Sequence, residues 1–190
     1  MSDNNIELTS TISEDNTLEL ALNEIVIRVE AAPINPSDLG VMFSAADMST
    51  ASQSGSADRP VISADVPAKF MGAVKKRVGK AIPVGNEGAG TVVAAGSSDA
   101  AQSLMGKTVA FIGGGSYRKY LCANVQSCLE MAPGTTADEA ASSFVNPLTS
   151  LAMVETMRAE GHKAIVHAAA ASNLGQMLNR ICLADGIDLV

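Results

Sequence analysis

The stretch from Lys163 to Val190 constrains the fold of this chain more than any other. It opens with an apolar run, Lys163 to Ala169, which is typical of a strand buried in a parallel sheet. One apolar helical face follows, and Gly186 ends this predicted helix; the face consists of Leu174, Met177, Leu178, Ile181 and Cys182. Ile187 to Val190 then begins another strand. The order strand, helix, strand predicts the opening unit of a doubly wound α/β sheet. Because one such unit cannot cover both faces of a parallel sheet, we expect a truncated domain.

Two helices are predicted just before this unit. Thr136-Ala-Asp-Glu139 has the form of a capping box, so the first helix should begin there. The second is indicated by an apolar series between Leu148 and Met157, and Gly161 stops it.

The first 134 residues predict short strands instead, separated by Gly- and Pro-containing turns, which is the pattern of a β-barrel or sandwich. The strands are expected at Ile6–Ile12, Thr17–Leu22, 25–31, Val61–Val66, within Pro83–Ala95, at Gly106–Ile112 and at Tyr117–Val125.

One short helix interrupts these strands. Asn35-Pro36 predicts its start, because Asn can cap a helix and Pro is tolerated at the first helical position. Residues 47–60, rich in Ser, Ala, Thr and Gly, are predicted to form a loop. The pattern of residues 67–82 favours no single secondary structure.

Composition excludes several classes of function. The net charge is −7, and the chain has no Trp, two Tyr and four Phe, which disfavours binding to nucleic acid or to anionic membranes. No apolar run is long enough to cross a bilayer. The polar N-terminus has no signal- or transit-peptide character, and the three cysteines fit no zinc spacing. We therefore expect a cytoplasmic protein with reduced thiols.

Five motifs, in this order along the chain, resemble those of the zinc-independent NADPH:quinone oxidoreductases of the medium-chain dehydrogenase/reductase family. The order of the five is more specific than any one motif. They are Val26–Asp38 with its Asn-Pro-Ser-Asp end, Pro83–Val93 with Gly-Asn-Glu-Gly-Ala-Gly, Gly115–Tyr120, Asn146–Ser150 and Ala168–Gly175.

This resemblance implies a fold and an activity. The fold would be α/β plus β, with a GroES-like β-barrel catalytic domain at residues 1–134. A partial dinucleotide-binding (Rossmann) domain would follow at 135–190, truncated after its first β-α-β unit. The implied reaction is hydride transfer from NADP(H) to a quinone or other α,β-unsaturated carbonyl. A small-molecule substrate and a homodimer would be the partners.

The resemblance also provides a test for zinc. Zinc-dependent members have a Cys where Asn35 stands and a His where Asn86 stands, and amide side chains are poor zinc ligands. The cysteine-rich structural zinc lobe is also missing. We therefore expect no metal site, so chemistry would depend on hydride positioning and hydrogen-bond donors.

The cofactor prediction depends on the turn Ser172-Asn173-Leu174-Gly175. Phosphates favour a helix N-terminus, and close approach of a backbone requires a small residue such as Gly175. The glycine-rich fingerprint of dinucleotide-binding turns is mostly lost here, since Ala and Ser-Asn occupy the earlier glycine positions. The alternative is an ordinary strand-to-helix turn.

Three further residues are assigned to the cofactor site by the resemblance. Asn146 and Thr149 would contact the nicotinamide carboxamide or ribose, and Asn35 would lie on the substrate side of the nicotinamide. Asn146 and Asn35 have an alternative role as helix caps. No catalytic residue is assigned.

Other conspicuous groups are interpreted as structural. Glu87 is expected to be buried with a partner and to support the cleft. His167 is expected to be a satisfied core or strand-end histidine rather than an acid–base group, and Gly113–Gly115 a turn between strands. Lys75-Lys76-Arg77 is expected to be a solvated loop, with a phosphate clamp as the alternative.

Two alternative functions remain open. A 2-enoyl thioester reductase shares the Gly-Asn-Glu-Gly and Val-Asn-Pro motifs, but its members use a Tyr donor, and residues 39–50 contain none. The chain could also be a non-catalytic binding module. Because half of the cofactor domain is missing, we expect the 190-residue chain alone to bind NADPH poorly. The residue that separates NADH from NADPH would lie after Val190.

Overall fold

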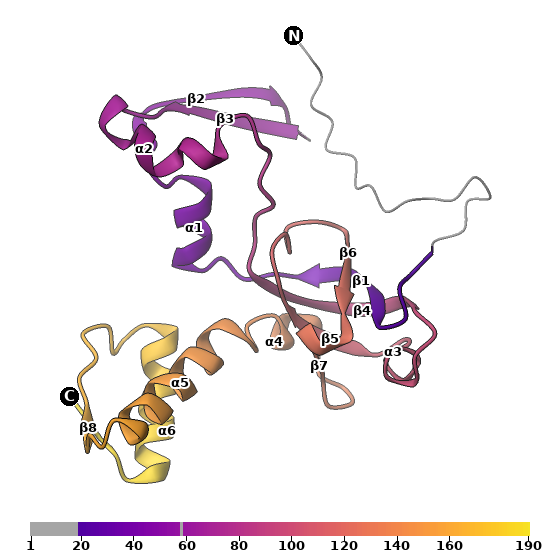
Figure 1. The fold of residues 1–190 in the computed structure, drawn as a ribbon, viewed down its shortest axis with the longest axis vertical. Helices are drawn as coiled ribbons and strands as arrows, with labels where there is room; N and C mark the ends of the chain where they lie inside the picture. Colours follow the sequence, from indigo (N-terminus) through magenta and orange to yellow (C-terminus); the bar gives the residue numbers. More distant parts are fainter. Residues whose placement is uncertain (1–18, 58) are drawn as a thin grey trace. The chain divides into compact units, whose positions relative to one another are not determined.

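The computed structural model describes residues 19–57 and 59–190 (Figure 1). The predicted strand Ile6–Ile12 lies outside the described residues. The chain divides into two compact units. In the described part, unit 1 is Ile34–Val84, and unit 2 comprises residues 19–33 and Gly85–Val190. The predicted domain boundary at residue 134 lies inside unit 2 and stays a prediction.

Unit 2 begins with an antiparallel sheet of five strands in the order β6-β1-β4-β5-β7. Four of the strands were predicted, and the short β7 was not. Their bounds are Glu24–Ala31 (β1), Glu87–Ala95 (β4), Thr108–Ile112 (β5), Tyr120–Asn124 (β6) and Cys128–Glu130 (β7).

The start of the sheet corrects one prediction. Residues 19–22 were expected to belong to a strand, but they form none. Instead, the N–H of Glu24 donates to the Ala21 carbonyl at 2.9 Å, and the Glu24 carboxylate accepts from the Ala21 N–H at 2.9 Å. These two bonds form a turn that leads directly into β1.

One face of the sheet forms the main core of unit 2. Ile25 and Ile27 alternate with less buried neighbours along β1, as the period-2 pattern predicted. The helix α3 (Asp99–Ser103), which was not predicted, adds Ala101 to this core, and Ser98 caps it by accepting from the Ala101 N–H at 3.1 Å. The other members of the core are Val92, Leu104, Val109, Phe111 and Leu121.

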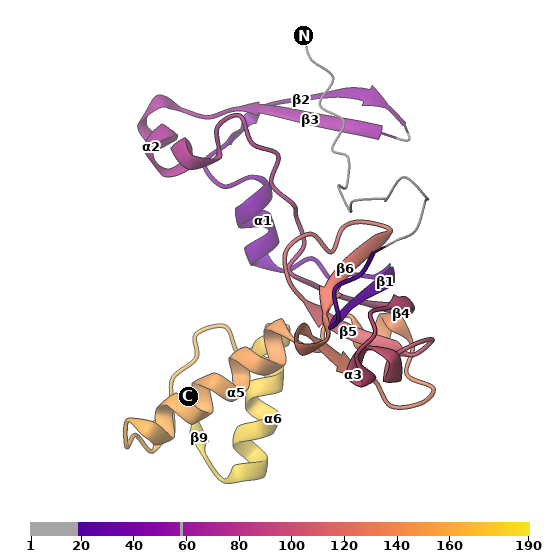
Figure 2. The same cartoon turned by 45° about the vertical axis from the view of Figure 1, so that its right-hand side comes forward.

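Three helices follow the sheet in the sequence. α4 (Ala137–Ala140) begins at the predicted capping box, in which Glu139 Oε2 accepts from the Thr136 N–H at 2.9 Å. α5 (Val145–Ala159) and α6 (Asn173–Asp185) lie side by side in Figures 1 and 2, and they bury Val154, Leu178 and Cys182 between them. None of the described helices combines the length and apolar character that crossing a bilayer requires.

The predicted β-α-β unit is present. β8 (Ala164–Ile165) precedes α6 in the sequence, β9 (Asp188–Leu189) follows it, and the two strands pair in parallel. α6 ends at Gly186, which has the left-handed conformation (φ 66°). The prediction of a buried strand over 163–169 was wrong, because β8 has two residues and Val166 is 81% exposed. Ile165 packs on the α5–α6 core, whereas Ala164 on the opposite side of the strand is exposed.

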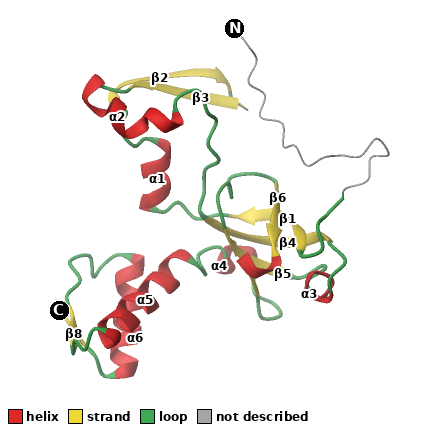
Figure 3. Ribbon diagram, viewed as in Figure 1, coloured by secondary structure: helices red, strands yellow, loops and turns green. Residues whose placement is uncertain are grey.

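Unit 1 contains a helix, a hairpin and a helical segment (Figure 3). Asn35 is the N-cap residue of α1 (Pro36–Met42), as predicted. The loop predicted at 47–60 is instead the hairpin β2 (Asp47–Ser56) and β3 (Arg59–Asp65), and β3 matches the strand predicted near Val61. Every residue of β2 is exposed, so no alternation of polar and apolar residues marks it. Residues 68–77 form three short helical turns, η1 (Ala68–Phe70), α2 (Met71–Val74) and η2 (Lys75–Arg77).

Gly90 allows β1 and β4 to pair closely. A Cβ at this position would lie 2.0 Å from the Arg28 carbonyl oxygen, which belongs to the partner strand. We expect Gly90→Ala to lower the free energy of unfolding by roughly 2–3 kcal/mol, because backbone rather than a flexible side chain must move. Gly40→Ala in α1 is the control, since nothing lies within 4 Å of its Cβ position. That substitution should stabilise by about 0.5–1 kcal/mol. Urea unfolding measures the free energy of unfolding of both variants. An equal change in the two variants would contradict this explanation.

Candidate cofactor site

Glu87 joins the sheet to the helices of unit 2. It is the first residue of β4, and its side chain is 1% exposed. Its Oε2 accepts from the N–H groups of Phe144 at 3.0 Å and Val145 at 2.9 Å, at the start of α5. A carboxylate is stabilised there by the positive end of the helix dipole. The expectation that Glu87 is buried with a partner is confirmed, and its support of a cleft stays a prediction.

This contact explains why Asn146 does not cap α5. The N-cap residue is Phe144, which makes no side-chain cap, and Asn146 is the second residue of the helix. The predicted capping role of Asn146 was therefore wrong, because the helix begins before Asn146 and Glu87 bonds the first two N–H groups of the helix start, those of Phe144 and Val145. The half-buried Asn146 side chain is not needed for that task.

Thr149 lies one turn further along α5. Its hydroxyl donates to the Val145 carbonyl at 2.6 Å, within the helix. A hydroxyl has one proton and two lone pairs, so the Thr149 oxygen keeps only acceptor capacity for a ligand. It can receive a hydrogen bond from an amide NH₂ or a sugar hydroxyl, but it cannot donate to a carbonyl oxygen while it bonds Val145.

Ser150 connects α5 to the predicted phosphate turn. It is fully buried, and its hydroxyl lies 3.0 Å from the Asn146 carbonyl and 3.3 Å from the Leu174 carbonyl. The hydroxyl has one proton, which these two carbonyls share, so the longer branch to Leu174 is the contact by which Ser150 links α5 to the first turn of α6. Sequence reasoning missed Ser150, because a serine on an apolar helix face gives no signal until its partner in α6 is known.

The turn before α6 has the geometry of a capped helix start. Ser172 is the N-cap, and its Oγ accepts from the Gly175 N–H at 3.0 Å. The N–H groups of Asn173 and Leu174 are the first two of the helix, so no carbonyl of α6 precedes them in the i−4 position. They are the donors that this turn can offer to an anion.

Gly175 is required by the protein itself. A Cβ there would lie 2.5 Å from the Ala169 carbonyl oxygen and 2.6 Å from that of Ala170. The small residue therefore lets the loop after β8 fold back against α6. This packing reason differs from the predicted one, which was the close approach of a phosphate.

A shallow cavity of about 440 Å³ lies along the side of α5 in unit 2. Thr149 is the only one of the predicted site residues among those that line it. His167 also lines the cavity, and its Nε2 is buried with no hydrogen-bond partner in the described part of the chain. The other lining residues are Ala152, Met153, Thr156, Met157, His162, Ala164, Ile165 and Val166.

Asn35, the remaining predicted residue, belongs to unit 1. It is 5% exposed, and its N–H donates to Asp38 Oδ2 at 2.8 Å. Asp38 is fully buried at the start of α1. The predicted capping position of Asn35 is thus confirmed, whereas its role toward a cofactor is untested. The other six predicted residues all belong to unit 2.

Two observations on the described side chains concern metal binding and nucleophilic chemistry. Within residues 19–57 and 59–190, no three His, Cys, Asp or Glu side chains lie together as a metal ion would require. All three cysteines are free thiols. Burial raises the pKa of Cys128 to about 11, and burial together with nearby acidic residues raises the pKa of Cys122 and Cys182. Because the thiolate is the nucleophile, these cysteines are poor nucleophiles at neutral pH.

Comparisons with known proteins identify the fold. No protein-family profile and no curated protein sequence match the chain, but many solved structures do. One is a protein from Mesorhizobium loti provisionally named an NADPH:quinone reductase, with 30% identity and a TM-score of 0.62 over 89% of this chain and 42% of that one. Another is the quinone oxidoreductase from Thermus thermophilus, also solved with NADPH, with 21% identity and a TM-score of 0.56 over 90% and 45%. The CurK enoyl reductase matches with 19% identity and a TM-score of 0.62 over 88% and 45%.

These neighbours are quinone oxidoreductases and enoyl reductases of the medium-chain dehydrogenase/reductase family. The predicted resemblance to quinone oxidoreductases of this family is therefore confirmed, and the chain has part of the fold of that family. It spans less than half the length of these three structures.

Glu87→Gln tests the connection between sheet and helix. The substitution keeps the volume but removes the charge from two buried hydrogen bonds, so we expect stability to fall by about 1.5–3 kcal/mol. Amide hydrogen exchange at Phe144 and Val145 should also accelerate. Glu139→Gln is the control, because Glu139 accepts from Thr136 in an exposed capping box. Equal losses for the two variants, or unchanged exchange at the start of α5, would show that Glu87 does not have this role.

The raised thiol pKa values predict slow alkylation at neutral pH. At about pH 8, roughly one Cys128 side chain in a thousand would be thiolate, and that fraction should rise about tenfold per pH unit until the pH approaches its pKa. Mass spectrometry after iodoacetamide treatment at several pH values measures this for each cysteine. Fast, pH-independent labelling of Cys128 in the folded chain would contradict the raised pKa of this thiol.

Proposed function

We propose that this chain is part of an NADPH-dependent oxidoreductase that transfers hydride to a quinone or another α,β-unsaturated carbonyl without zinc. The observation that supports this most is the contact through Ser150 between α5 and the capped turn at the start of α6. The chain that makes this contact is 30% identical to the Mesorhizobium loti protein. That connection joins the two groups of residues that the resemblance assigned to the cofactor. NADPH, when bound, supplies the hydride.

The residues of the turn fit a cofactor phosphate. α6 is thirteen residues long, so its dipole is developed, and Asn173 and Leu174 offer N–H groups at its positive end. Ser172 and Gly175 have a supporting role in this proposal. The Ser172 hydroxyl bonds the Gly175 N–H, and Gly175 keeps the preceding loop close. Two backbone donors, rather than four residues, would therefore contact the phosphate.

The residues of α5 fit the nicotinamide end. Thr149 offers a lone pair to the carboxamide NH₂ or a ribose hydroxyl, since its own proton bonds Val145. The Asn146 side chain, which has no capping task, offers both an acceptor and donors. Glu87 acts through the backbone of α5 and is a positioning residue in this proposal.

Zinc independence rests on the side chains at two positions. Asn35 and Asn86 stand where zinc-dependent relatives have thiolate and imidazole ligands, and amides are poor substitutes. The chain's role toward the substrate would then be to orient the acceptor and to provide hydrogen bonds to the developing negative charge. A cytoplasmic location, a homodimer, and a boundary near residue 134 between a barrel domain and a nucleotide-binding domain belong to the same proposal.

A 2-enoyl thioester reductase is the second candidate. The observation in its favour is the likeness to CurK enoyl reductase, although at 19% identity this concerns the fold alone. Against it, residues 39–50 contain no Tyr to serve as a proton donor. Parallel assays of NADPH oxidation with a quinone and with an enoyl thioester, using a chain that includes a whole nucleotide-binding domain, distinguish the two. Oxidation with the thioester alone would favour the second candidate.

Thr149→Val tests the cofactor site directly. We expect the 190-residue chain to bind NADPH with a Kd on the order of millimolar, and this variant to weaken binding about three- to tenfold through the loss of one hydrogen bond. Thr156→Val is the matched control, because Thr156 lies two turns later on α5 and also lines the 440 Å³ cavity. NADPH fluorescence titration measures all three chains. An unchanged Kd for Thr149→Val, or an equal loss for Thr156→Val, would count against the site.

A further inference from the structure

Unit 1 contains a cavity of its own, with a volume of about 320 Å³. One side of the cavity is formed by the end of α1 and the turn that follows it, and the other side by the segment from Val66 to Val84. The volume is at the lower end of the range for small-molecule sites. Nine of its twelve lining residues are apolar, namely Val41, Phe43, Ala45, Ala46, Val66, Val74, Val78, Ile82 and Val84.

The polar lining residues are Ser44, Arg77 and Lys80, of which two are cationic and none is acidic. This matches the charge of the surrounding segment. Residues 66–86 contain five of the thirteen Lys and Arg side chains and no Asp or Glu, although the net charge of the whole chain is −7. The segment that forms one wall of the apolar cavity is therefore cationic and attracts anions, although Asp47 and Asp65 directly adjoin the lining residues Ala46 and Val66.

Arg77 makes one structural hydrogen bond and keeps further N–H donors for a ligand. Its Nη2 donates to the Val41 carbonyl at the end of α1, where a cation is favoured by the helix dipole. This bond fixes the guanidinium against the cavity wall. A guanidinium has five N–H groups, so one bond to a carbonyl leaves others for a ligand.

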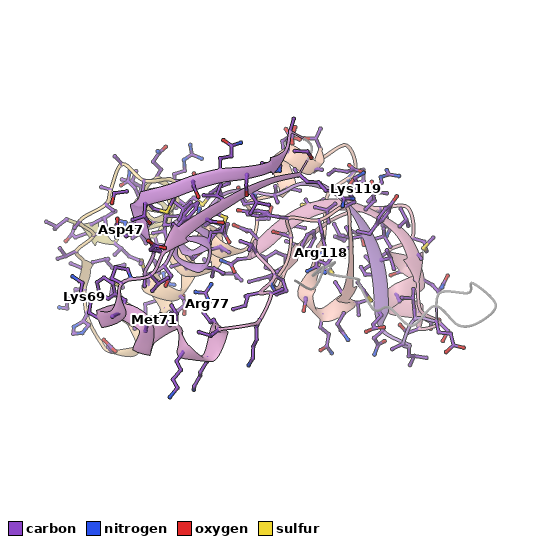
Figure 4. All side chains as sticks on the ribbon, turned by 90° about the horizontal axis from the view of Figure 1, so that it is seen from above. Asp47, Lys69, Met71, Arg77, Arg118 and Lys119 are labelled. Carbon is purple, nitrogen blue, oxygen red and sulfur yellow. The ribbon has the colours of Figure 1, made fainter. Side chains whose placement is uncertain are left out.

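Figure 4 labels both Arg77 and Lys69, which lie at separate places along this segment. The Lys69 ammonium lies 4.9 Å from the centre of the Phe70 ring, and Lys69 does not line the cavity. The two cations that do line it are Arg77 and Lys80. Lys69 therefore provides a matched control for charge.

The turn at the cavity rim is strained. Ser44 has φ 33°, and it is the only described non-glycine residue with a positive φ. Backbone hydrogen bonds on both sides hold Ser44 in this conformation. The Phe43 N–H donates to the Leu39 carbonyl at 2.8 Å, and the Ala46 N–H donates to the Phe43 carbonyl at 2.7 Å. Left-handed backbone at a non-glycine residue is unfavourable and is concentrated at ligand sites.

We propose that this cavity binds a small amphipathic anion, with an apolar chain against the valines and an anionic head group at Arg77 and Lys80. All of its lining residues belong to unit 1, and none belongs to the proposed cofactor turn. The head group is a carboxylate or a phosphate monoester, because both accept from a guanidinium and an ammonium. Neither an apolar molecule without charge nor an anion without a chain satisfies both parts of the lining.

Titration of the whole chain with four probes tests this proposal. Octanoate and octyl phosphate supply the two head groups, octanol lacks the charge, and acetate lacks the chain. We expect saturable calorimetric binding of octanoate or octyl phosphate or both, weakening as salt is added, and at least tenfold weaker binding of octanol and acetate. Octanol or acetate binding as tightly as octanoate would overturn the proposal, as would no saturable binding of either anionic probe.

Lys80→Gln and Lys69→Gln locate the site. Both residues are exposed, so both variants should fold. We expect Lys80→Gln to weaken binding of the anionic probe about tenfold and Lys69→Gln to leave it within about twofold, because only Lys80 lines the cavity. Equal effects of the two variants would show general attraction to a basic surface and would overturn the assigned site.

Discussion

One buried carboxylate joins the antiparallel sheet of unit 2 to the helices that follow it. Glu87 begins β4, and it bonds the first N–H groups of α5 at 2.9 and 3.0 Å. Leaving such a group buried without partners would cost several kcal/mol, so strand and helix specify each other's position. α5 then determines where Asn146 and Thr149 lie, and Ser150 extends the connection to the turn before α6. The candidate site depends on this chain of contacts.

The parts of this fold that sequence predicts are those with a local or periodic signal. The alternation of Ile25 and Ile27 gave β1, the Thr136–Glu139 capping box gave α4, and Gly186 marked the end of α6. Each of these signals is complete within a few residues, and the β-α-β order followed from the spacing between them.

The rest depends on partners distant in the sequence. Every residue of β2 is exposed, so its small polar residues resemble a loop until the strand is paired with β3. Asn146 beside Pro147 resembles a helix cap until Glu87 occupies the helix start, 57 residues away from Phe144. Gly175 fits a phosphate turn by pattern, but its packing reason is the pair of carbonyls at Ala169 and Ala170. Ser150 was missed for the same cause, since its second partner lies 24 residues further along.

A crystal structure of this chain grown with NADPH tests the central claim most directly. Phosphate oxygens should lie within hydrogen-bond distance of the Asn173 and Leu174 N–H groups, and the Thr149 oxygen should accept from the nicotinamide carboxamide or a ribose hydroxyl. A structure that places the phosphates away from the start of α6, with Thr149 facing no part of the cofactor, would contradict it.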